Sequence, residues 1–320
     1  MKKRHVLLVA LGLVLALGSG AQALPKTRVI MFCTGEAQGV FNALGGGLIS
    51  AMKKDMPEQN FKITNTSGAQ ANCKLVGEEV MDLGLSHGET LGFAAVGDSR
   101  GGSRQPLPNI RVVAALFSNY LHVVVAKDAG AGKLEDLKGK RINLGPAGSG
   151  TAVTADLLLE TLGFKRLDLS RVCNRPLTDN PQKFRQNGLD AAIVVQGLPS
   201  DHAAKALAAG GALMPIPPEI YQAMAGFNKS YRYQPIPKGT YEGQDQDVPT
   251  VSVPTFLITN AKLDDDTVYK ITKALFSHKD LLLAAHPSAK EISLAGAAQN
   301  PPVPLHPGAA RFYREKGVIK

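Results

Sequence analysis

Two glycine-rich turns in the sequence have the composition of anion-binding turns. Residues 145–151, Gly-Pro-Ala-Gly-Ser-Gly-Thr, follow the apolar segment 141–144 and lead at once into a helical pattern. Residues 34–39 likewise separate the strand-like segment 29–32 from a helical pattern at 40–52. At such junctions, unpaired backbone N–H groups and the positive end of a helix dipole point at one place and can hold an anion without a metal. Because the two turns lie far apart in the chain, the sequence predicts two lobes that grip one small anionic ligand.

Further candidate contacts lie where predicted strands end or predicted helices begin. Polar groups just past the carboxyl end of a strand occupy the place where α/β sheets bind ligands. Four of these residues follow strands and two lie in the first turns of helices, where a helix cap or an exposed polar residue is the alternative. They are Ser86, His87, Gln196 and Gly197 after strands, and Gln38 and Asn72 at helix starts.

Patterns for catalysis, nucleotide binding and metal binding are missing from the sequence. The 145–151 turn lacks the lysine of a P-loop and the spacing of a dinucleotide-binding turn. Around Ser149 the glycines are also too close for a nucleophile elbow. The histidines are scattered, and none has the spacing of a zinc ligand pair. We therefore expect a protein without cofactor, metal or enzymatic activity. An exported hydrolase that uses Ser149 or another serine is the weaker alternative, which incubation with candidate substrates would reveal.

The elements that position these residues alternate between strand and helix patterns, which is typical of an α/β fold with a mainly parallel sheet. The predicted strands are 27–32, 61–64, 81–85, 110–116, 121–126, 141–144, 190–195 and 251–259. The predicted helices are 38–53, 70–78, 151–162, 201–209, 264–277 and 307–316. Residues 97–109 and 234–249 have the composition of surface loops. The run Gly45-Gly46-Gly47 costs about 1 kcal/mol per residue in a helix, so a close approach of the helix to the sheet or to a ligand, or a kink, is expected there.

Length and composition fit a globular protein with room for two domains. The chain has 320 residues, of which 44% are hydrophobic and 20% charged, and its formal net charge is +9. The basic residues are dispersed and are not interleaved with aromatic residues. This distribution favours a mild attraction for anions and argues against a nucleic-acid partner.

The first 23 residues have the pattern of a secretory signal peptide. Lys2, Lys3 and Arg4 precede an apolar run at 6–17 that is too short to span a bilayer comfortably, and residues 21–23, Ala-Gln-Ala, form a cleavage signal. The sequence thus predicts export to the periplasm and cleavage after Ala23, with an uncleaved N-terminal anchor as the alternative.

Three cysteines remain in an exported chain that can be oxidised: Cys33, Cys73 and Cys173. An odd number allows at most one internal disulfide bond. Cys33 ends the first predicted strand and Cys73 lies in the helix after the next strand, so a Cys33–Cys73 bridge is one expectation. Buried free thiols are the other, slightly favoured, expectation.

A series of motifs along the chain resembles the TAXI family of TRAP-transporter solute-binding proteins. The match spans essentially the whole chain after the signal peptide. In order, the matching segments are Thr34-Gly35, Leu44-Gly45-Gly46, 107–110, 121–125, 136–141, 145–151, 239–241, 243–244, 247–250 and 305–313.

The resemblance implies a two-lobed periplasmic binding-protein fold of type II, with a ligand cleft between lobes joined by crossing strands. We expect residues 24–120 to begin the first lobe, 121–250 to form the second, and 251–320 to return to the first. The implied partners are a small, carboxylate-bearing solute and a TRAP membrane permease, and we expect a monomer. A subunit that reports its ligand to a signalling receptor is the alternative, which neighbouring genes would distinguish.

The resemblance also assigns ligand contacts to the first turn, to the segment after the third strand and to the Gly-Ser-Gly-Thr turn. Carried over to this sequence, these are Thr34, Gly35, Gln38, Gly39, Val40, Ser86, His87, Ser149, Gly150 and Thr151. The chain departs from the family pattern at 36–42 and at 86–89. Both segments belong to the expected pocket, so the identity of the solute stays open.

Overall fold

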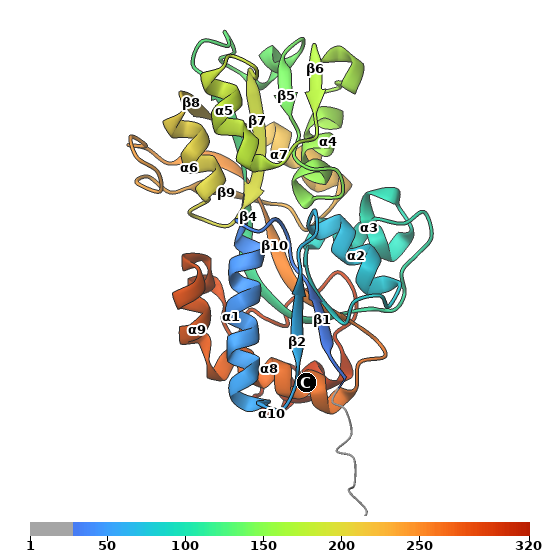
Figure 1. Cartoon of the computed structure of the whole chain (residues 1–320). Coiled ribbons are helices and arrows are strands. Elements are labelled where there is room, and N and C mark those ends of the chain that lie inside the picture. Colours follow the sequence, from blue (N-terminus) through green and yellow to red (C-terminus); the bar gives the residue numbers. More distant parts are fainter. Residues whose placement is uncertain (1–27) are drawn as a thin grey trace, which may run out of the picture.

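The computed structural model describes residues 28–320, and it contains one ten-stranded mixed sheet flanked by helices (Figure 1). The main strand order is β2-β1-β3-β10-β4-β7-β5-β6, with β8 paired to β4 and β9 paired to β10. Among these residues, every helix is too short or too polar to cross a bilayer. The predicted signal peptide and its cleavage site lie outside the described residues.

The elements form two groups, which we call the first and the second lobe, stacked along the direction of β4 and β10 (Figure 1). The first lobe contains β1 (Ile30–Cys33), α1 (Val40–Asp55), β2 (Phe61–Thr64), α2 (Ala69–Gly77), β3 (Leu83–His87), α3 (Gly88–Val96), α8 (Asp265–Ser277), α9 (Lys279–Ala285) and α10 (Pro307–Glu315). The second contains β5 (Arg141–Asn143), α4 (Gly150–Thr161), β6 (Arg171–Cys173), α5 (Asn180–Arg185), β7 (Ala191–Gln196), α6 (Asp201–Ala208), β8 (Gly211–Met214), α7 (Pro218–Phe227) and β9 (Arg232–Ile236).

Two long strands connect the lobes. β4 (Ile110–Ala126) and β10 (Val248–Asn260) run antiparallel through the middle of the sheet and pair from Asn260↔Ile110 to Ser252↔Tyr120. The two predicted strands at 110–116 and 121–126 are therefore one strand. Its polar stretch 118–120 lies between the two hydrophobic cores rather than in a loop. The expected lobe boundaries, after residues 120 and 250, fall within these two strands.

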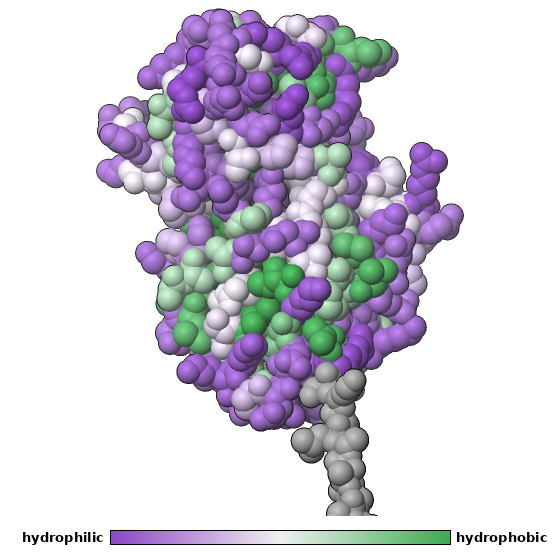
Figure 2. Space-filling view, in the orientation of Figure 1, coloured by the Kyte–Doolittle hydropathy of each residue, from purple (hydrophilic) through white to green (hydrophobic). Residues whose placement is uncertain are grey.

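Each lobe has its own hydrophobic core. In the first, the buried face of α1 packs with β1, β3, α8 and α10, and includes Leu44, Leu48 and Met52. In the second, β4, β5 and β7 pack against α4 and α7. Figure 2 shows hydrophilic residues over most of the second lobe on this face, with hydrophobic residues gathered mainly on the first.

The glycines inside α1 allow close contacts. A Cβ on Gly45 would lie 2.5 Å from Thr34 Cγ2, and a Cβ on Gly47 would lie 2.9 Å from the Ala285 Cβ on α9. Close approach to Thr34, the residue after β1, and to α9 therefore accounts for two of the three glycines. Nothing lies within 4 Å of a Cβ built on Gly46.

Several short elements were not predicted from the sequence. They are α3, β6, α5, β8, α7, β9 and α9. Residues 232–236 form β9, although part of this segment was expected to belong to a loop, because they pair with β10. Such short segments carry too few residues for a clear period, and their structure depends on neighbours far away in the sequence.

The structure contains no bridge between Cys33 and Cys73, which corrects that expectation; all three cysteines are free thiols. Cys33 Sγ donates to the Leu83 carbonyl oxygen at 3.3 Å, and Cys73 Sγ lies 3.0 Å from Ser86 Oγ. Burial raises the pKa of the Cys33 thiol strongly and that of Cys73 to about 12. Both thiols therefore stay protonated and act as small core residues.

Candidate functional site

A cleft lies between the lobes, at the ends of β1, β3 and β7. In the first lobe, the turns before α1 and α2 and the residue His87 form the wall of the cleft. The second lobe contributes the turn before α4, Leu177 and the end of β7. The lining residues are Gly35, Glu36, Gly39, Val40, Phe41, Ser67, Gly68, Ala69, His87, Asn119, Pro146, Ser149, Gly150, Thr151, Leu177, Val195 and Gln196.

Four helices begin at this cleft. The residues that precede α1, α2, α3 and α4 are Gly39, Gly68, His87 and Ser149, and all four line the cleft. Only Ser149 caps its own helix with its side chain, accepting from the Ala152 amide at 3.0 Å. The first N–H groups of a helix have no partner within it, and the helix dipole adds partial positive charge there. The four ends together create a positive potential without a cationic residue.

Ionisable side chains are scarce in the lining. Glu36 and His87 are its only ionisable residues, and it includes neither lysine nor arginine. Burial raises the pKa of the Glu36 carboxyl, partly opposed by the Leu177 backbone, and nearby Asp179 raises it further. Among residues 28–320, no group of three His, Cys, Asp or Glu residues is placed to hold a metal ion.

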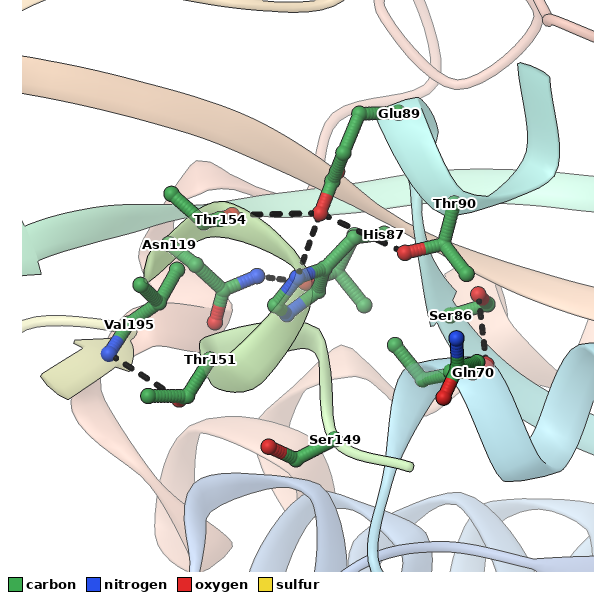
Figure 3. Close-up of polar contacts among 12 residues, drawn as sticks. Gln70, Ser86, His87, Glu89, Thr90, Asn119, Ser149, Thr151, Thr154 and Val195 are labelled. Atoms are coloured by element: carbon green, nitrogen blue, oxygen red, sulfur yellow. Dashed lines mark hydrogen bonds and ion pairs between the residues drawn. The ribbon is translucent and has the colours of Figure 1, made fainter. Parts of the chain in front are cut away.

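A buried polar network lies behind His87 (Figure 3). His87 Nδ1 lies 3.2 Å from Glu89 Oε1, and the hydroxyls of Thr90 and Thr154 donate to the same oxygen at 3.3 Å. Thr154 in turn lies 3.2 Å from the Tyr231 hydroxyl. Since Thr154 and Tyr231 belong to the second lobe, this network joins the two lobes below the cleft.

Direct contacts between the lobes indicate a closed arrangement. The Ala71 amide donates to the Gly148 carbonyl oxygen at 3.0 Å, and Asn228 Nδ2 donates to the Glu89 carbonyl oxygen at 3.2 Å. Gly150 lies so close to His87 that a Cβ there would be 2.2 Å from Nδ1. The two glycine-rich turns thus face one cleft, as the sequence predicts for two lobes that grip one ligand.

Eight of the thirteen predicted contact residues line the cleft: Gly35, Gly39, Val40, His87, Ser149, Gly150, Thr151 and Gln196. Thr151 Oγ1 accepts from the Val195 amide at 3.2 Å. The Gln196 amide is oriented by Ser200 and His202, which donate to its Oε1 at 2.6 and 3.0 Å. Gln196 Nε2, which lies near Gly39, therefore remains available as a donor. That these residues bind a ligand stays a prediction.

The other five predicted residues do not line the cleft, and each has a structural reason. Gln38 is exposed, and Gly197 packs so closely on Ser288 and Phe117 that a Cβ would clash with both. Thr34, Asn72 and Ser86 are fully buried below the cleft wall. Asn72 Nδ2 donates to the carbonyl oxygens of Thr34 and Leu85 at 2.6 and 2.7 Å, and thereby ties the ends of β1 and β3 together.

Nine lining residues were not predicted: Glu36, Phe41, Ser67, Gly68, Ala69, Pro146, Asn119, Leu177 and Val195. Ser67 and Gly68 belong to a third strand–turn–helix junction, between β2 and α2, which has the same polar and glycine composition as the two junctions that were identified. Asn119 is buried in the middle of β4, where its Nδ2 donates to Thr255 Oγ1 on β10. No local pattern marks it.

The chain is similar to known proteins over most of its length. Residues 32–317 of the chain match the NMT1-like family. The periplasmic binding protein BugD matches with a TM-score of 0.55 and 11% identity, over 92% of this chain and 95% of that one. MatC from Rhodopseudomonas palustris, solved with bound malate, matches with a TM-score of 0.55 and 15% identity, over 92% and 99%.

A third similar structure is PhnD1 from Prochlorococcus marinus in complex with methylphosphonate, with a TM-score of 0.51 and 13% identity, over 83% of this chain and 88% of that one. At such low identity these likenesses establish the fold alone. The fold is the predicted α/β two-lobed periplasmic binding-protein fold, with its cleft between lobes joined by crossing strands.

Proposed function

Because the chain belongs to the NMT1-like family, we propose that it is a solute-binding protein that holds a small organic anion between its lobes. The observation that carries the proposal is the convergence of four helix N-termini on a cleft that lacks lysine and arginine. Such a site favours an anion through backbone N–H groups and dipoles. The proteins MatC and PhnD1, of the same fold, were solved with malate and methylphosphonate, which are both anions.

The finer part of the proposal is a role in a TRAP-type transporter. It rests on the ordered motifs of the TAXI family, from Thr34-Gly35 to residues 305–313. In this role the protein works in the periplasm, and the closed form delivers its carboxylate-bearing solute to a membrane permease. A permease gene beside the gene for this chain supports transport, whereas a neighbouring receptor kinase gene supports sensing.

A thermal-shift screen tests the binding function. The panel contains small carboxylates, amino acids, phosphonates and sulfonates, each paired with a neutral amide or alcohol of similar shape. A ligand at about 100 times its Kd stabilises the native state by about 2.7 kcal/mol, which raises the Tm by several degrees. Anions that raise the Tm while their neutral counterparts do not support the proposal. Equal Tm shifts for an anion and its neutral counterpart, or no Tm shift with any compound of the panel, contradict the proposal.

Protein purified from the periplasm should begin at Leu24, and a start at Met1 would contradict signal cleavage.

Ser149→Ala is expected to weaken ligand binding more than it weakens the fold. The hydroxyl caps α4, and loss of such a cap costs about 1 kcal/mol of stability. Its hydrogen atom can also be donated to a bound anion, and a charged hydrogen bond contributes roughly 1.5–3 kcal/mol, so the Kd should rise about tenfold or more. Isothermal titration calorimetry with the ligand from the screen measures this.

Asp264→Ala is the matched control for the Ser149 variant. Asp264 caps α8 by accepting from the Thr267 amide at 2.8 Å, and it lies outside the cleft lining. Its loss should reduce stability to a similar degree and leave the Kd unchanged. If the Ser149 variant also keeps the wild-type Kd, Ser149 contributes no side-chain contact to the ligand.

A further inference from the structure

A groove separate from the cleft lies on the other face of the two strands that connect the lobes. Its floor is formed by Ala115 of β4 and by Pro254 and Phe256 of β10. Thr255, between the last two, faces the other way, because its Oγ1 accepts a hydrogen bond from Asn119, which lines the cleft. Successive side chains of a strand point to opposite faces of its sheet. The groove and the cleft therefore lie on opposite sides of β10, and they share no lining residue.

The walls of the groove belong to both lobes. Gly92 of α3 and residues from the segment 296–302 line it from the first lobe, and residues from the turn 228–232, between α7 and β9, line it from the second. Pro302 adds to the apolar lining, and Phe256 on the floor is almost completely buried. The groove is therefore a hollow with an apolar bottom, which is the shape of a small-molecule site rather than of a flat protein surface.

Two cationic side chains lie at the rim of this groove. Lys229 and Arg232 are the only ionisable residues in its lining, and both are exposed. The ion pairs within residues 28–320 involve neither of them. Because no Asp or Glu residue lines the groove, the two charges make it a place where an anion is attracted. Both residues lie outside the cleft lining, so the proposed function does not account for them.

The backbone that carries the two cations is held in place by hydrogen bonds. Asn228 Oδ1 accepts from the Ser230 amide at 2.9 Å, and Asn228 Nδ2 donates to the Glu89 carbonyl oxygen on α3 at 3.2 Å. Arg232 begins β9, where it pairs with Ser252 of β10. The cations therefore start from fixed positions above the apolar floor, which lowers the ordering cost of binding a ligand between them.

We infer that this groove is a second binding site, which takes a small organic anion with an apolar body, such as an aromatic carboxylate or sulfonate. The apolar body packs on Pro254 and Phe256, and the acidic group meets Lys229 and Arg232. Burial of apolar surface and charge-assisted hydrogen bonds both contribute to binding, so a neutral molecule or a bare anion makes only half of the contacts. The inference does not rest on the proposed function, because the cleft is a different site.

NMR spectra of the alanine methyl groups test the site, with naphthalene-2-sulfonate as the probe. Ala115 lines the groove and Ala69 lines the cleft, so their two signals report on the two sites separately. The variants Ala115→Ser and Ala69→Ser assign these signals. The probe should shift the Ala115 signal in a saturable manner with a Kd of about 1 mM or lower, as is usual for a ligand of this size. An Ala115 signal that does not move at up to about 10 mM probe would overturn the inference.

Two double variants separate a direct contact from a general effect of charge. Lys229→Gln with Arg232→Gln should raise the Kd read at Ala115 about tenfold or more, because both charged contacts are lost. Lys205→Gln with Lys238→Gln is the matched control, since it removes two exposed positive charges from the same lobe outside both linings. Salt screens distant charges, so the control should keep the Kd within about twofold of wild type. Equal Kd values in the two double variants would contradict the role of the cations.

Two further compounds test the chemical class of the ligand. Naphthalene-2-sulfonamide keeps the rings without the charge, and methanesulfonate keeps the charge without the rings. Each should bind the groove at least about tenfold more weakly than the probe, as measured at the Ala115 signal or by displacement of the probe. An equal Kd for the sulfonamide would refute the anion, and an equal Kd for methanesulfonate would refute the apolar body. An Ala69 signal that responds to no anion counts against the proposed function alone, whereas an Ala115 signal that does not respond counts against the groove alone.

Discussion

Gly150→Ala is expected to weaken ligand binding strongly while the protein stays folded. A Cβ at this position would lie 2.2 Å from His87 Nδ1, 2.4 Å from its Cε1 and 3.0 Å from Ala69 Cβ. The imidazole cannot turn away freely, because it is buried and paired with Glu89. Since Gly150 and His87 belong to different lobes, the clash is relieved when the lobes separate. Overpacking costs about 1–3 kcal/mol, so the Kd should rise roughly ten- to a hundredfold.

Gly226→Ala supplies the control, since it makes the same substitution in a helix of the same lobe. No atom lies within 4 Å of a Cβ built there, so α7 should gain up to about 1 kcal/mol of helix stability and the Kd should not change. Calorimetry measures both affinities, and small-angle X-ray scattering reports whether the Gly150 variant stays open with ligand. An affinity equal to wild type in the Gly150 variant would show that the lobes close differently from the arrangement described here.

His122 should make the protein less stable in mild acid. It is fully buried; Nδ1–H donates to the Val194 carbonyl oxygen at 3.2 Å, and Nε2 accepts from the Tyr241 hydroxyl at 2.7 Å. Burial lowers the pKa of His122 from 6.5 to about 4. Below pH 6.5, His122 therefore binds a proton in the unfolded chain but not in the folded protein. The free energy of unfolding should fall by about 1.4 kcal/mol per pH unit from pH 6.5 towards pH 4, or about 2 kcal/mol at pH 5.

Urea unfolding of wild type and His122→Gln at about pH 7.5 and pH 5 isolates this contribution. Glutamine keeps a donor and an acceptor but cannot titrate, so the variant should lose about 2 kcal/mol less than wild type between the two pH values. Burial also lowers the pKa of His202, His286 and His306, so the variant should remain acid-sensitive to some degree. The same loss in both proteins would mean that His122 does not contribute.

The sequence was most informative where one local pattern contains both the structure and the chemistry. The turns before α1 and α4 each combine a strand end, glycines and a helix start, and both face the cleft. Thr34 and Ser86, which were also predicted as contacts, do not line the cleft, because their hydroxyls make buried hydrogen bonds within the first lobe. Next to a strand end, a change of one residue decides whether a side chain points to the cleft or to the core.

The features that depend on the placement of the two lobes could not be predicted in this way. The polar stretch at 118–120 suggested a break, but it is the place where β4 passes between the cores, with Asn119 in the cleft wall. The sequence predicts that the third strand ends at residue 85, whereas β3 continues to His87 and α3 begins at Gly88. The contact of His87 with Gly150 joins residues on two lobes, whose distance is set by β4 and β10.

The position of β10 affects how the chain can fold as it is synthesised. Proteins usually fold one unit after another, beginning from the N-terminus. Here β3 and the first half of β4 both pair with β10, for example Leu85 with Leu257 and Ala115 with Phe256. The Tyr313 hydroxyl of α10 also donates to the Val113 carbonyl oxygen at 2.8 Å. The N-terminal part of the first lobe is therefore synthesised first but completed last. Until residues 248–313 have been synthesised, the edges of β3 and β4 that pair with β10 stay unpaired, and a chaperone or an aggregating partner can bind them.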